Sequence, residues 1–382
     1  MNQRSFIRLL SAVCLAVSVM ACVAQPPVQR NVAVTRAELL NGAIFGLEPE
    51  AQLPPINLTA VNDDMRVFLK DHVPEHLGDQ RKVKLILGAI LQDGLLLNYN
   101  NFKTYTAREA FYTREGNCLS FTNLFIALAR EAGVRVYYQE VDLPPSWSAQ
   151  GDTFLYNLHI NAIVKVQGGP ADLVVDFDME SFETKYDRRR IPDRVALSHY
   201  HNNMGVHLMN EGGMVAAFQH FREALRLRPN TGYIWSNLAT LYRRAGYLEE
   251  AEAAYLAAID IDSEKSALSN LSRLYSSIGE DELAAYYASR VQLYRRKNPY
   301  YQFYLAQQAY AENHYPEAET LLLAAIKRRK DEHKFYRLLG LTYLQMGEVE
   351  EAQKRIRQAY DLTDSPKQRE LYNHKLQLLA GH

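Results

Sequence analysis

The chain has 382 residues, of which 47% are hydrophobic, and its 43 basic and 44 acidic residues leave a formal net charge of −1. This length and composition are sufficient for two domains with apolar cores. The near-neutral charge argues against a general nucleic-acid-binding protein, which carries a basic surplus, so we expect no nucleic-acid partner. Of the three cysteines, Cys14 and Cys22 lie close to the N-terminus and Cys118 lies well inside the chain.

Residues 1–21 have the three zones of an export signal, with an apolar run that is too short to span a bilayer. The Val-Met-Ala-Cys sequence at 19–22 resembles a bacterial lipobox, which implies that Cys22 is the acylated first residue of the mature protein. The alternative is ordinary cleavage after Ala24, which leaves no lipid. The lipobox interpretation, with Val23 after the cysteine, implies a lipoprotein held at the periplasmic face of the outer membrane.

Three regions follow the signal. Residues 22–55 contain two proline pairs and are expected to form a tether with one short helix near 36–46. Residues 56–195 mix helical and strand-like patterns, which predicts an α+β domain. Its helices are predicted at 63–71, 80–91 and 117–132, and its strands at 134–141, 158–166 and 173–177. Three arginines at 188–190 are interpreted as part of the linker to the next region.

Residues 196–365 repeat at a fixed period. A small residue recurs 34, 33, 34 and 34 residues apart, at Gly205, Ala239, Ser272, Ala306 and Gly340. Small residues also recur twelve and nineteen positions after these, with one valine in the last column. Small residues at fixed positions let two antiparallel helices approach closely, and bulky residues such as Trp235 fill the groove beside them.

This spacing resembles the tetratricopeptide repeat and predicts an all-α solenoid of five units. Residues 366–382 are apolar at helical spacing and are predicted to form a capping helix. A solenoid presents a concave surface, so we expect a protein or peptide partner there.

Cys118 is the one thiol that remains after export and lipidation. It lies at the start of the predicted helix, where partial positive charge and free N–H groups stabilise a thiolate. His159 follows 41 residues later and Asp176 a further 17 residues later, both in predicted strands. A thiol followed by a histidine and a carboxylate indicates a nucleophile, a base and an orienting group. For Cys118 alone, the alternative is a buried structural cysteine.

The alternation of side chains along the two strands places His159 and a carboxylate on one face. Apolar residues alternate with His159 in the first strand and with Asp176 in the second. In an antiparallel pair, a four-residue loop at 166–169 would set His159 across from Asp176, and a two-residue loop would set it across from Asp178. Either carboxylate would favour the imidazolium form. The alternative is an incidental ion pair on a polar face.

The sequence around Cys118 resembles the core helix of transglutaminase-like proteins. That family has Gly-x-Cys, an apolar helix, Ala-Leu-x-Arg and then Gly-Ile or Gly-Val before a strand, and this chain has matching sequences at 116–118, 127–130 and 133–134. The resemblance covers about residues 108–177. It implies a papain-like α+β fold.

The resemblance also implies residue roles. Cys118 would be the nucleophile, His159 the general base and acid, and Asp176 the orienting group, in preference to Asp178. The oxyanion hole would use the Cys118 N–H and one side-chain donor. Three candidates for that donor remain open: Asn117, Tyr112 and Trp147.

These features predict an envelope-anchored cysteine hydrolase or acyl transferase, of the peptidase, amidase or transglutaminase type, that acts on an amide bond. The alternative is a non-catalytic assembly lipoprotein whose repeats bind partners and whose triad is vestigial. The sequence has no phosphate-binding glycine loop or dinucleotide fingerprint, so no cofactor is expected. His199, His201 and His207 cluster near the first repeat without companion ligands, so no metal site is expected.

Overall fold

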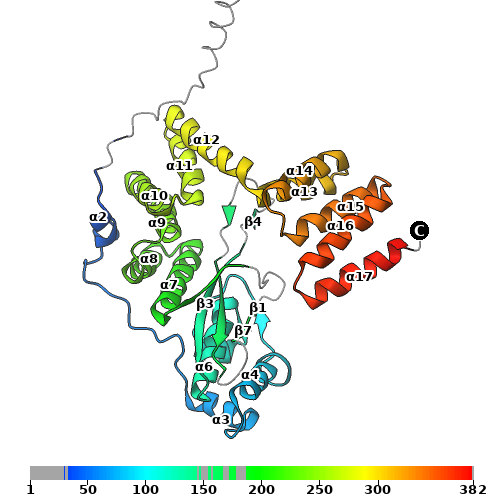
Figure 1. Cartoon of the computed structure of the whole chain (residues 1–382). Helices are drawn as coiled ribbons and strands as arrows, with labels where there is room; N and C mark the ends of the chain where they lie inside the picture. Colours follow the sequence, from blue (N-terminus) through cyan, green and yellow to red (C-terminus); the bar gives the residue numbers. More distant parts are fainter. Residues whose placement is uncertain are drawn as a thin grey trace, which may run out of the picture.

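The computed structural model describes residues 30, 33–143, 146–147, 154–155, 158–166, 172–177 and 186–380. The predicted export signal, Cys22, the Gly168-Gly169 turn and Asp178 lie outside these residues. Figure 1 shows an α+β domain followed by a curved array of helices. In the described part of the chain, no helix is long and apolar enough to cross a membrane.

The helices of the α+β domain surround α6. They are α3 (Asp63–His72), α4 (Asp79–Gly88) with the π turn η2 (Ala89–Asp93), α5 (Ala107–Thr113) and α6 (Cys118–Glu131). Every residue of α6 from Leu119 to Ala129 is buried, which agrees with its apolar composition on all sides. The three helices predicted from the sequence are confirmed, with ends shifted by a few residues.

A four-stranded antiparallel sheet, in the order β7-β6-β3-β8, packs against α6. Its strands are β3 (Val136–Asp142), β6 (Leu158–Val164), β7 (Leu173–Val175) and β8 (Arg188–Ile191). Tyr138, Ala162 and Val164 join the core that contains α6. The interpretation of residues 188–190 as a linker is wrong, because these arginines pair with Val141, Glu140 and Gln139 in the sheet. The strand was not predicted because its sequence is a run of positive charges. In the sheet, the Glu140 carboxylate binds Arg189, and the Tyr137 ring stacks against Arg190.

Two small sheets join distant segments. Strands β1 (Asn98–Tyr99) and β2 (Glu115–Gly116) run parallel just before α6. Strands β4 (Ser146–Trp147) and β5 (Phe154–Leu155) form an antiparallel pair between β3 and β6. In the helical array, β4 contacts α13 and β5 contacts α11. The segment that links β3 to β6 therefore reaches the repeats.

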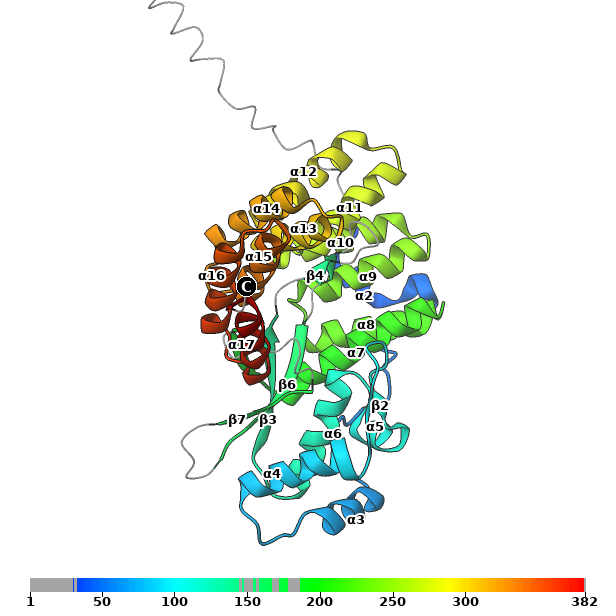
Figure 2. The same ribbon diagram turned by 90° about the vertical axis from the view of Figure 1, so that its right-hand side faces the viewer.

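Each predicted repeat is one helix pair. The pairs are α7 (Asp193–Asn210) and α8 (Met214–Leu227), α9 (Gly232–Arg244) and α10 (Leu248–Asp262), α11 (Lys265–Ser277) and α12 (Asp281–Lys297), α13 (Pro299–Ala311) and α14 (Tyr315–Arg328), and α15 (His333–Gln345) and α16 (Val349–Leu362). Helix α17 (Pro366–Ala380) ends the array. Figure 2, with Figure 1, shows the array curving away from the α+β domain through α11 and α12 and back towards α17.

The small residue that recurs once in each repeat unit lies where the two helices of the unit cross. A Cβ atom on Gly205 would come within 2.7 Å of the Phe221 ring, and one on Gly340 within 2.9 Å of Ile356. In the third unit, the Ser272 hydroxyl instead donates to the Ala284 carbonyl at 2.9 Å. Close approach of the paired helices thus explains why a small residue recurs at this position of the repeat.

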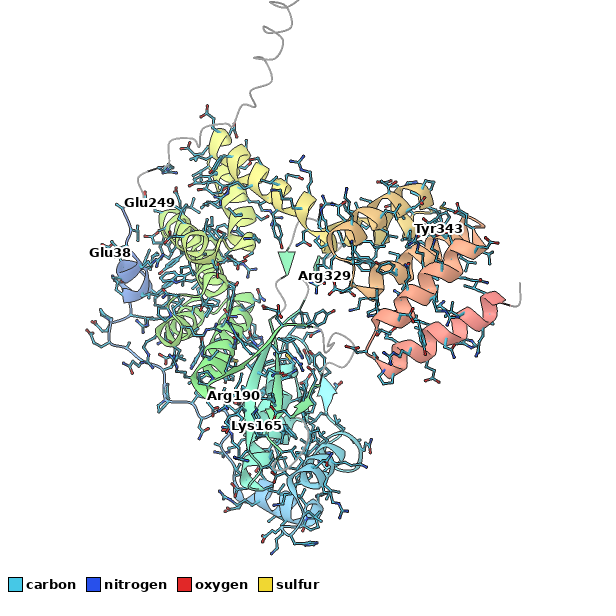
Figure 3. The ribbon with its side chains drawn as sticks, viewed as in Figure 1. Glu38, Lys165, Arg190, Glu249, Arg329 and Tyr343 are labelled. Carbon is cyan, nitrogen blue, oxygen red and sulfur yellow. The ribbon has the colours of Figure 1, made fainter. Side chains whose placement is uncertain are left out.

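The stretch expected to be a tether contains a docked segment. Helix α2 (Arg36–Asn41) and the 3₁₀ turn η1 (Ala43–Phe45) pack against the first repeats. Leu39 is buried in their core, and its carbonyl accepts a hydrogen bond of 2.6 Å from the Tyr242 hydroxyl. Figure 3 shows Glu38 of α2 on the same side of the array as Glu249 of α10. The described part of the N-terminal region therefore belongs to the array.

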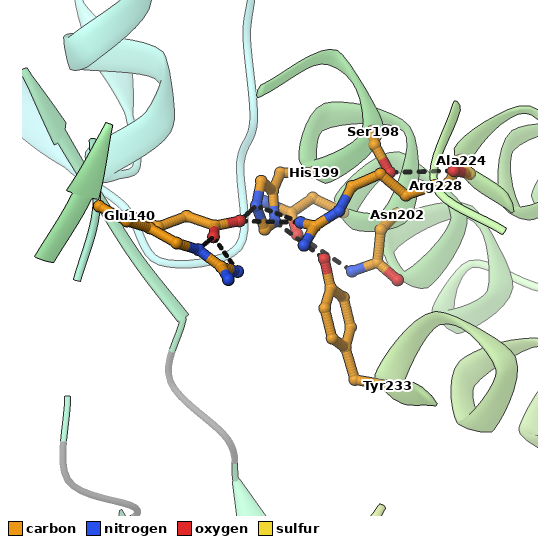
Figure 4. A network of polar contacts seen from close by, with 9 residues as sticks. Glu140, Ser198, His199, Asn202, Ala224, Arg228 and Tyr233 are labelled. Carbon is orange, nitrogen blue, oxygen red and sulfur yellow. Dashed lines mark hydrogen bonds and ion pairs between the residues drawn. The ribbon is translucent and has the colours of Figure 1, made fainter. Parts of the chain in front are cut away.

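A buried ionic network joins the sheet to the first repeats (Figure 4). The Glu140 carboxylate of β3 contacts His199 Nε2 at 2.5 Å, Arg228 Nη1 at 2.8 Å and Arg189 Nε at 2.5 Å. Burial would raise the pKa of Glu140, but His199 and the two guanidinium groups lower it to about 2. Burial lowers the pKa of His199. Neutral His199 therefore donates from Nε2 to Glu140 and accepts at Nδ1 from the Tyr233 hydroxyl, 2.9 Å away.

Candidate active site

The sequence Gly116-Asn117-Cys118 forms the start of α6, with Cys118 as its first residue, half-buried. Gly116 has a φ of 153°, and a Cβ atom there would come within 2.5 Å of Ser120 Cβ, so this position requires glycine. Asn117 is the N-cap, and its Oδ1 accepts a hydrogen bond of 3.1 Å from the Ser120 N–H. Because Cys118 is in the first turn, its own N–H has no intrahelical acceptor.

The structure brings Cys118, His159 and Asp176 together. His159 Nε2 lies 2.7 Å from both carboxylate oxygens of Asp176, and the two side chains are only 3% and 6% exposed. Cys118 also faces the His159 side chain, since its sulfur is one of the groups that raise the pKa of this imidazole. Since Nε2 is engaged with Asp176, we assign Nδ1 to the sulfur. These three residues lie on three separate elements, α6, β6 and the end of β7.

The charge state of His159 follows from its two partners. Burial alone would lower the pKa of His159, but hydrogen bonds to Asp176 and Cys118 and the negative charges of both raise it to about 10. The imidazole is therefore protonated at neutral pH.

The register of β6 and β7 is the one that a two-residue loop would produce. The pairs are Ala162 with Val175, Ile163 with Val174 and Val164 with Leu173. This register sets Asp176 across from Asn161 and not across from His159. The carboxylate reaches the imidazole diagonally, over two positions. The four-residue alternative is therefore wrong for the register, although Asp176 is the partner of His159.

Asn161 is the residue at this site that the sequence analysis missed. Its Nδ2 donates a hydrogen bond of 2.8 Å to Asp176 Oδ2, and its side chain is fully buried. Asn161 lies two positions after His159 in β6, on the same face. The same alternation of side chains along the strand that placed His159 on the face opposite the apolar residues therefore also placed Asn161 there.

Two of the three candidate oxyanion donors are engaged elsewhere. Asn117 Nδ2 donates to Thr104 Oγ1 at 2.7 Å while its oxygen caps α6. The Tyr112 hydroxyl donates to Asp64 at 2.5 Å, on the contact between α5 and α3. Both groups therefore have partners in local structure. The side chain of Trp147 lies outside what the structure describes.

Three aromatic rings lie beside the nucleophile. Phe121, one turn after Cys118, contacts Tyr99 of β1 with ring centroids 6.0 Å apart and Phe177 with centroids 5.8 Å apart. Phe177 follows Asp176 directly. Phe121 and Phe177 are thus close in the chain to two residues of the triad, and their rings pack on each other.

The histidine cluster near the first repeat has structural contacts. His199 is part of the network with Glu140, and His201 lies 3.1 Å from His220 through their Nδ1 atoms. Within the described residues, no group of three or more His, Cys, Asp or Glu side chains is arranged to hold a metal ion.

Comparison with protein families agrees with this architecture. Residues 78–221 match the transglutaminase-like superfamily, and this range contains Cys118, His159 and Asp176. Residues 233–265 and 303–372 match tetratricopeptide repeats. The chain contains a transglutaminase-like domain followed by tetratricopeptide repeats. The predicted fold class, an α+β domain followed by an all-α solenoid, is confirmed. A transglutaminase-like domain is compatible with a cysteine-dependent enzyme, and the repeats indicate a protein partner.

Several solved structures are similar to part of the chain. A MamA crystal structure is 17% identical over 43% of this chain and 91% of its own, with a TM-score of 0.25. YrrB, described as a TPR protein with an unusual peptide-binding site, is 16% identical over 47% and 91%, with a TM-score of 0.25. PilF of Pseudomonas aeruginosa is 15% identical over 48% and 85%, with a TM-score of 0.26. No curated protein matches the chain.

Proposed function

We propose that this protein is a cysteine hydrolase or acyl transferase that acts on an amide bond through Cys118, His159 and Asp176. The observation that carries the proposal is the buried imidazole of His159, which lies 2.7 Å from Asp176 and whose pKa is raised by Asp176 and by the thiol at the start of α6. A structural cysteine would need neither partner.

In the first step, the Cys118 thiolate attacks the carbonyl carbon of the amide. The developing oxyanion accepts a hydrogen bond from the Cys118 N–H, which has no acceptor within the helix. The C–N bond then breaks as the His159 imidazolium donates its proton to the leaving amine. The acyl group remains on the sulfur as a thioester.

In the second step, water or a second amine attacks the thioester. Neutral His159 now accepts a proton from this nucleophile, and the C–S bond breaks to restore the thiolate and the imidazolium. Asp176 keeps Nε2 protonated throughout and orients the ring. The raised pKa of His159 thus gives it the acid role first and the base role second.

The tetratricopeptide repeats would bind a protein partner or a segment of the substrate. This proposal is supported by the contacts of β4 with α13 and of β5 with α11, because this strand pair belongs to the segment between β3 and His159. A partner on these repeats would lie beside a segment that continues into the active-site strand.

The N-terminal segment would anchor the protein in the cell envelope through a lipid on Cys22, at the periplasmic face of the outer membrane. The proposal rests on the lipobox-like sequence at 19–22. Metabolic labelling with an alkyne fatty acid tests it directly. We expect labelling and membrane fractionation of the full chain, and loss of both in Cys22→Ala. Equal labelling of the two proteins would exclude this anchor.

The activity is tested by alkylation of Cys118 with iodoacetamide from pH 4 to 10, followed by mass spectrometry. We expect rapid alkylation at neutral pH, no modification of that peptide in Cys118→Ala, and a shift of the profile to higher pH in His159→Ala. The purified protein should also form a thioester with an activated acyl ester. Alkylation no faster than in the urea-unfolded chain would favour the alternative function, a non-catalytic assembly protein.

A further inference from the structure

The position of Asp176 depends on a residue outside the triad. The pairing of β7 with β6 ends at Val175, one residue before the carboxylate. The backbone ladder therefore does not extend to Asp176. In its place, the Asn161 Nδ2 donates a hydrogen bond of 2.8 Å to Asp176 Oδ2. A side-chain contact continues the association of the two strands where the ladder stops.

The diagonal geometry makes this contact important for the site. The register sets Asp176 across from Asn161, so the carboxylate must lean over two positions to reach His159. Cross-strand neighbours lie closer than diagonal ones, so the straight contact is easier to form. A donor directly across from Asp176 fixes one carboxylate oxygen while both oxygens face the imidazole.

The amide group of Asn161 is satisfied on one side only among the described residues: Nδ2 is bonded to Asp176, and Oδ1 is not bonded. Within the residues that the structure describes, the Asn161 Oδ1 is buried and has no hydrogen-bond partner. The opposite orientation of the amide would place this oxygen against the Asp176 carboxylate, so the contact itself determines the orientation. An unpaired buried acceptor destabilises a fold, so its presence here requires an explanation, which the donor contact to Asp176 provides.

We propose that Asn161 is a positioning residue, which holds the Asp176 carboxylate in the diagonal orientation that keeps His159 aligned with Cys118. This proposal rests on the proposed function, because it concerns the same triad. Among the described residues, the titratable groups that face His159 are Cys118 from α6 and Asp176 from the end of β7. From β3, the residue across from His159 is Val141, which is uncharged.

The chain offers a matched control in Asn123. Its side chain is also fully buried, but both of its polar groups are bonded, Nδ2 to the Tyr105 carbonyl at 2.9 Å and Oδ1 to the Tyr138 hydroxyl at 2.7 Å. Asn123 has no bond to the triad in the described structure. Asn123→Ala therefore reproduces the loss of a buried amide in the same domain without a direct effect on Asp176.

The experiment compares Asn161→Ala, Asn161→Leu and Asn123→Ala in the purified mature protein. Leucine keeps the branched skeleton of the asparagine side chain and removes both its donor and its unpaired oxygen, so this variant leaves no buried polar group unpaired at this position. Three quantities are measured for each protein: the thermal midpoint, the titration of His159 by NMR of histidine-labelled protein, and the pH profile of Cys118 alkylation.

We expect both Asn161 variants to alkylate about tenfold more slowly at neutral pH, with the half-maximal rate about one pH unit higher, as one pKa unit implies. The pKa of His159 should fall from about 10, because a carboxylate that has lost the Asn161 donor is held less firmly against the imidazolium. Asn123→Ala should lower the thermal midpoint more than either Asn161 variant and leave both pH profiles unchanged.

The inference is overturned if the His159 titration of both Asn161 variants matches the wild type, or if Asn123→Ala shifts it equally. The titration is measured without any substrate, so it judges Asn161 even if Cys118 proves unreactive. Slow alkylation in the wild type itself would instead count against the proposed function. The two failures are therefore distinguishable.

Discussion

The repeat array and the transglutaminase-like domain are organised by different kinds of contact. In the array, each helix packs on its sequence neighbours, and one small residue per unit marks each crossing, such as Gly205 against Phe221. In the domain, Cys118, His159 and Asp176 come from three elements and meet through the pairing of β6 with β7 and the packing of α6 on β6. Local contacts make the array predictable from its period, while the site depends on a register between distant segments.

The two regions meet at Glu140. This carboxylate lies on β3, the strand that pairs with the His159 strand, and contacts His199 and Arg228 from the repeats. Its neighbour Val141 lies directly across from His159. The junction is therefore adjacent to the site, and a change there tests whether the domain and the array are stable independently.

The largest effect is expected in the site. Asp176→Ala should reduce the rate of Cys118 acylation by an activated acyl ester about a hundredfold or more, because the imidazole loses its orienting partner. The control is Asp172→Ala, which removes an exposed carboxylate bonded to Lys165 near the start of β7. Stopped-flow release of the leaving group measures both rates. An equal loss in the two variants would show that Asp176 has no special role.

The next effect is expected at the junction. Glu140→Ala should lower the free energy of unfolding by about 3–5 kcal/mol, because it leaves Arg228 without its buried counter-charge. Glu249→Ala, which removes an exposed carboxylate on α10, is the control. Urea unfolding followed by circular dichroism measures the difference. If the array and the domain are independent, Glu140→Ala will split the transition into two without lowering the midpoint of the array.

The same network predicts an acid limit to stability. The pKa of Glu140 is lowered from 4.5 to about 2, so its contribution is fully present above pH 4.5 and is lost as the pH falls through about 2. The wild type should lose on the order of 3 kcal/mol more than Glu140→Gln between these pH values. Urea midpoints at pH 5 and pH 2.5 provide the measurement. Parallel losses in both proteins would mean that Glu140 titrates normally.

The smallest effect is expected in the array. Gly340→Ala should destabilise the protein by about 1–3 kcal/mol, because the added methyl group would lie 2.9 Å from Ile356. Gly88→Ala is the control, since it lies within α4 and its added Cβ would meet open space. That substitution should stabilise slightly, by about 0.5–1 kcal/mol. A lower thermal midpoint for Gly340→Ala together with a higher one for Gly88→Ala would confirm the close helix crossing. A higher midpoint for both variants would contradict it.

The comparison also explains which predictions succeeded. The helix at Cys118 was predictable because its glycine, its capping asparagine and its apolar run are consecutive. The strand at Arg188–Ile191 was not, because its charges are paired with Glu140 and stacked on Tyr137 only in the folded sheet. The docking of α2 on the first repeats was missed for a similar reason, since its partners are about 200 residues away.

The sequence by itself determined the period of the array, the helix that carries Cys118 and the face of each strand on which His159 and Asp176 lie. The tertiary structure decided the register that makes Asn161, and not His159, the residue across from Asp176. The physical reason is that a shift of two residues between strands leaves every side chain on the same face. Alternation in the sequence therefore selects the face, and only the packed sheet selects the partner.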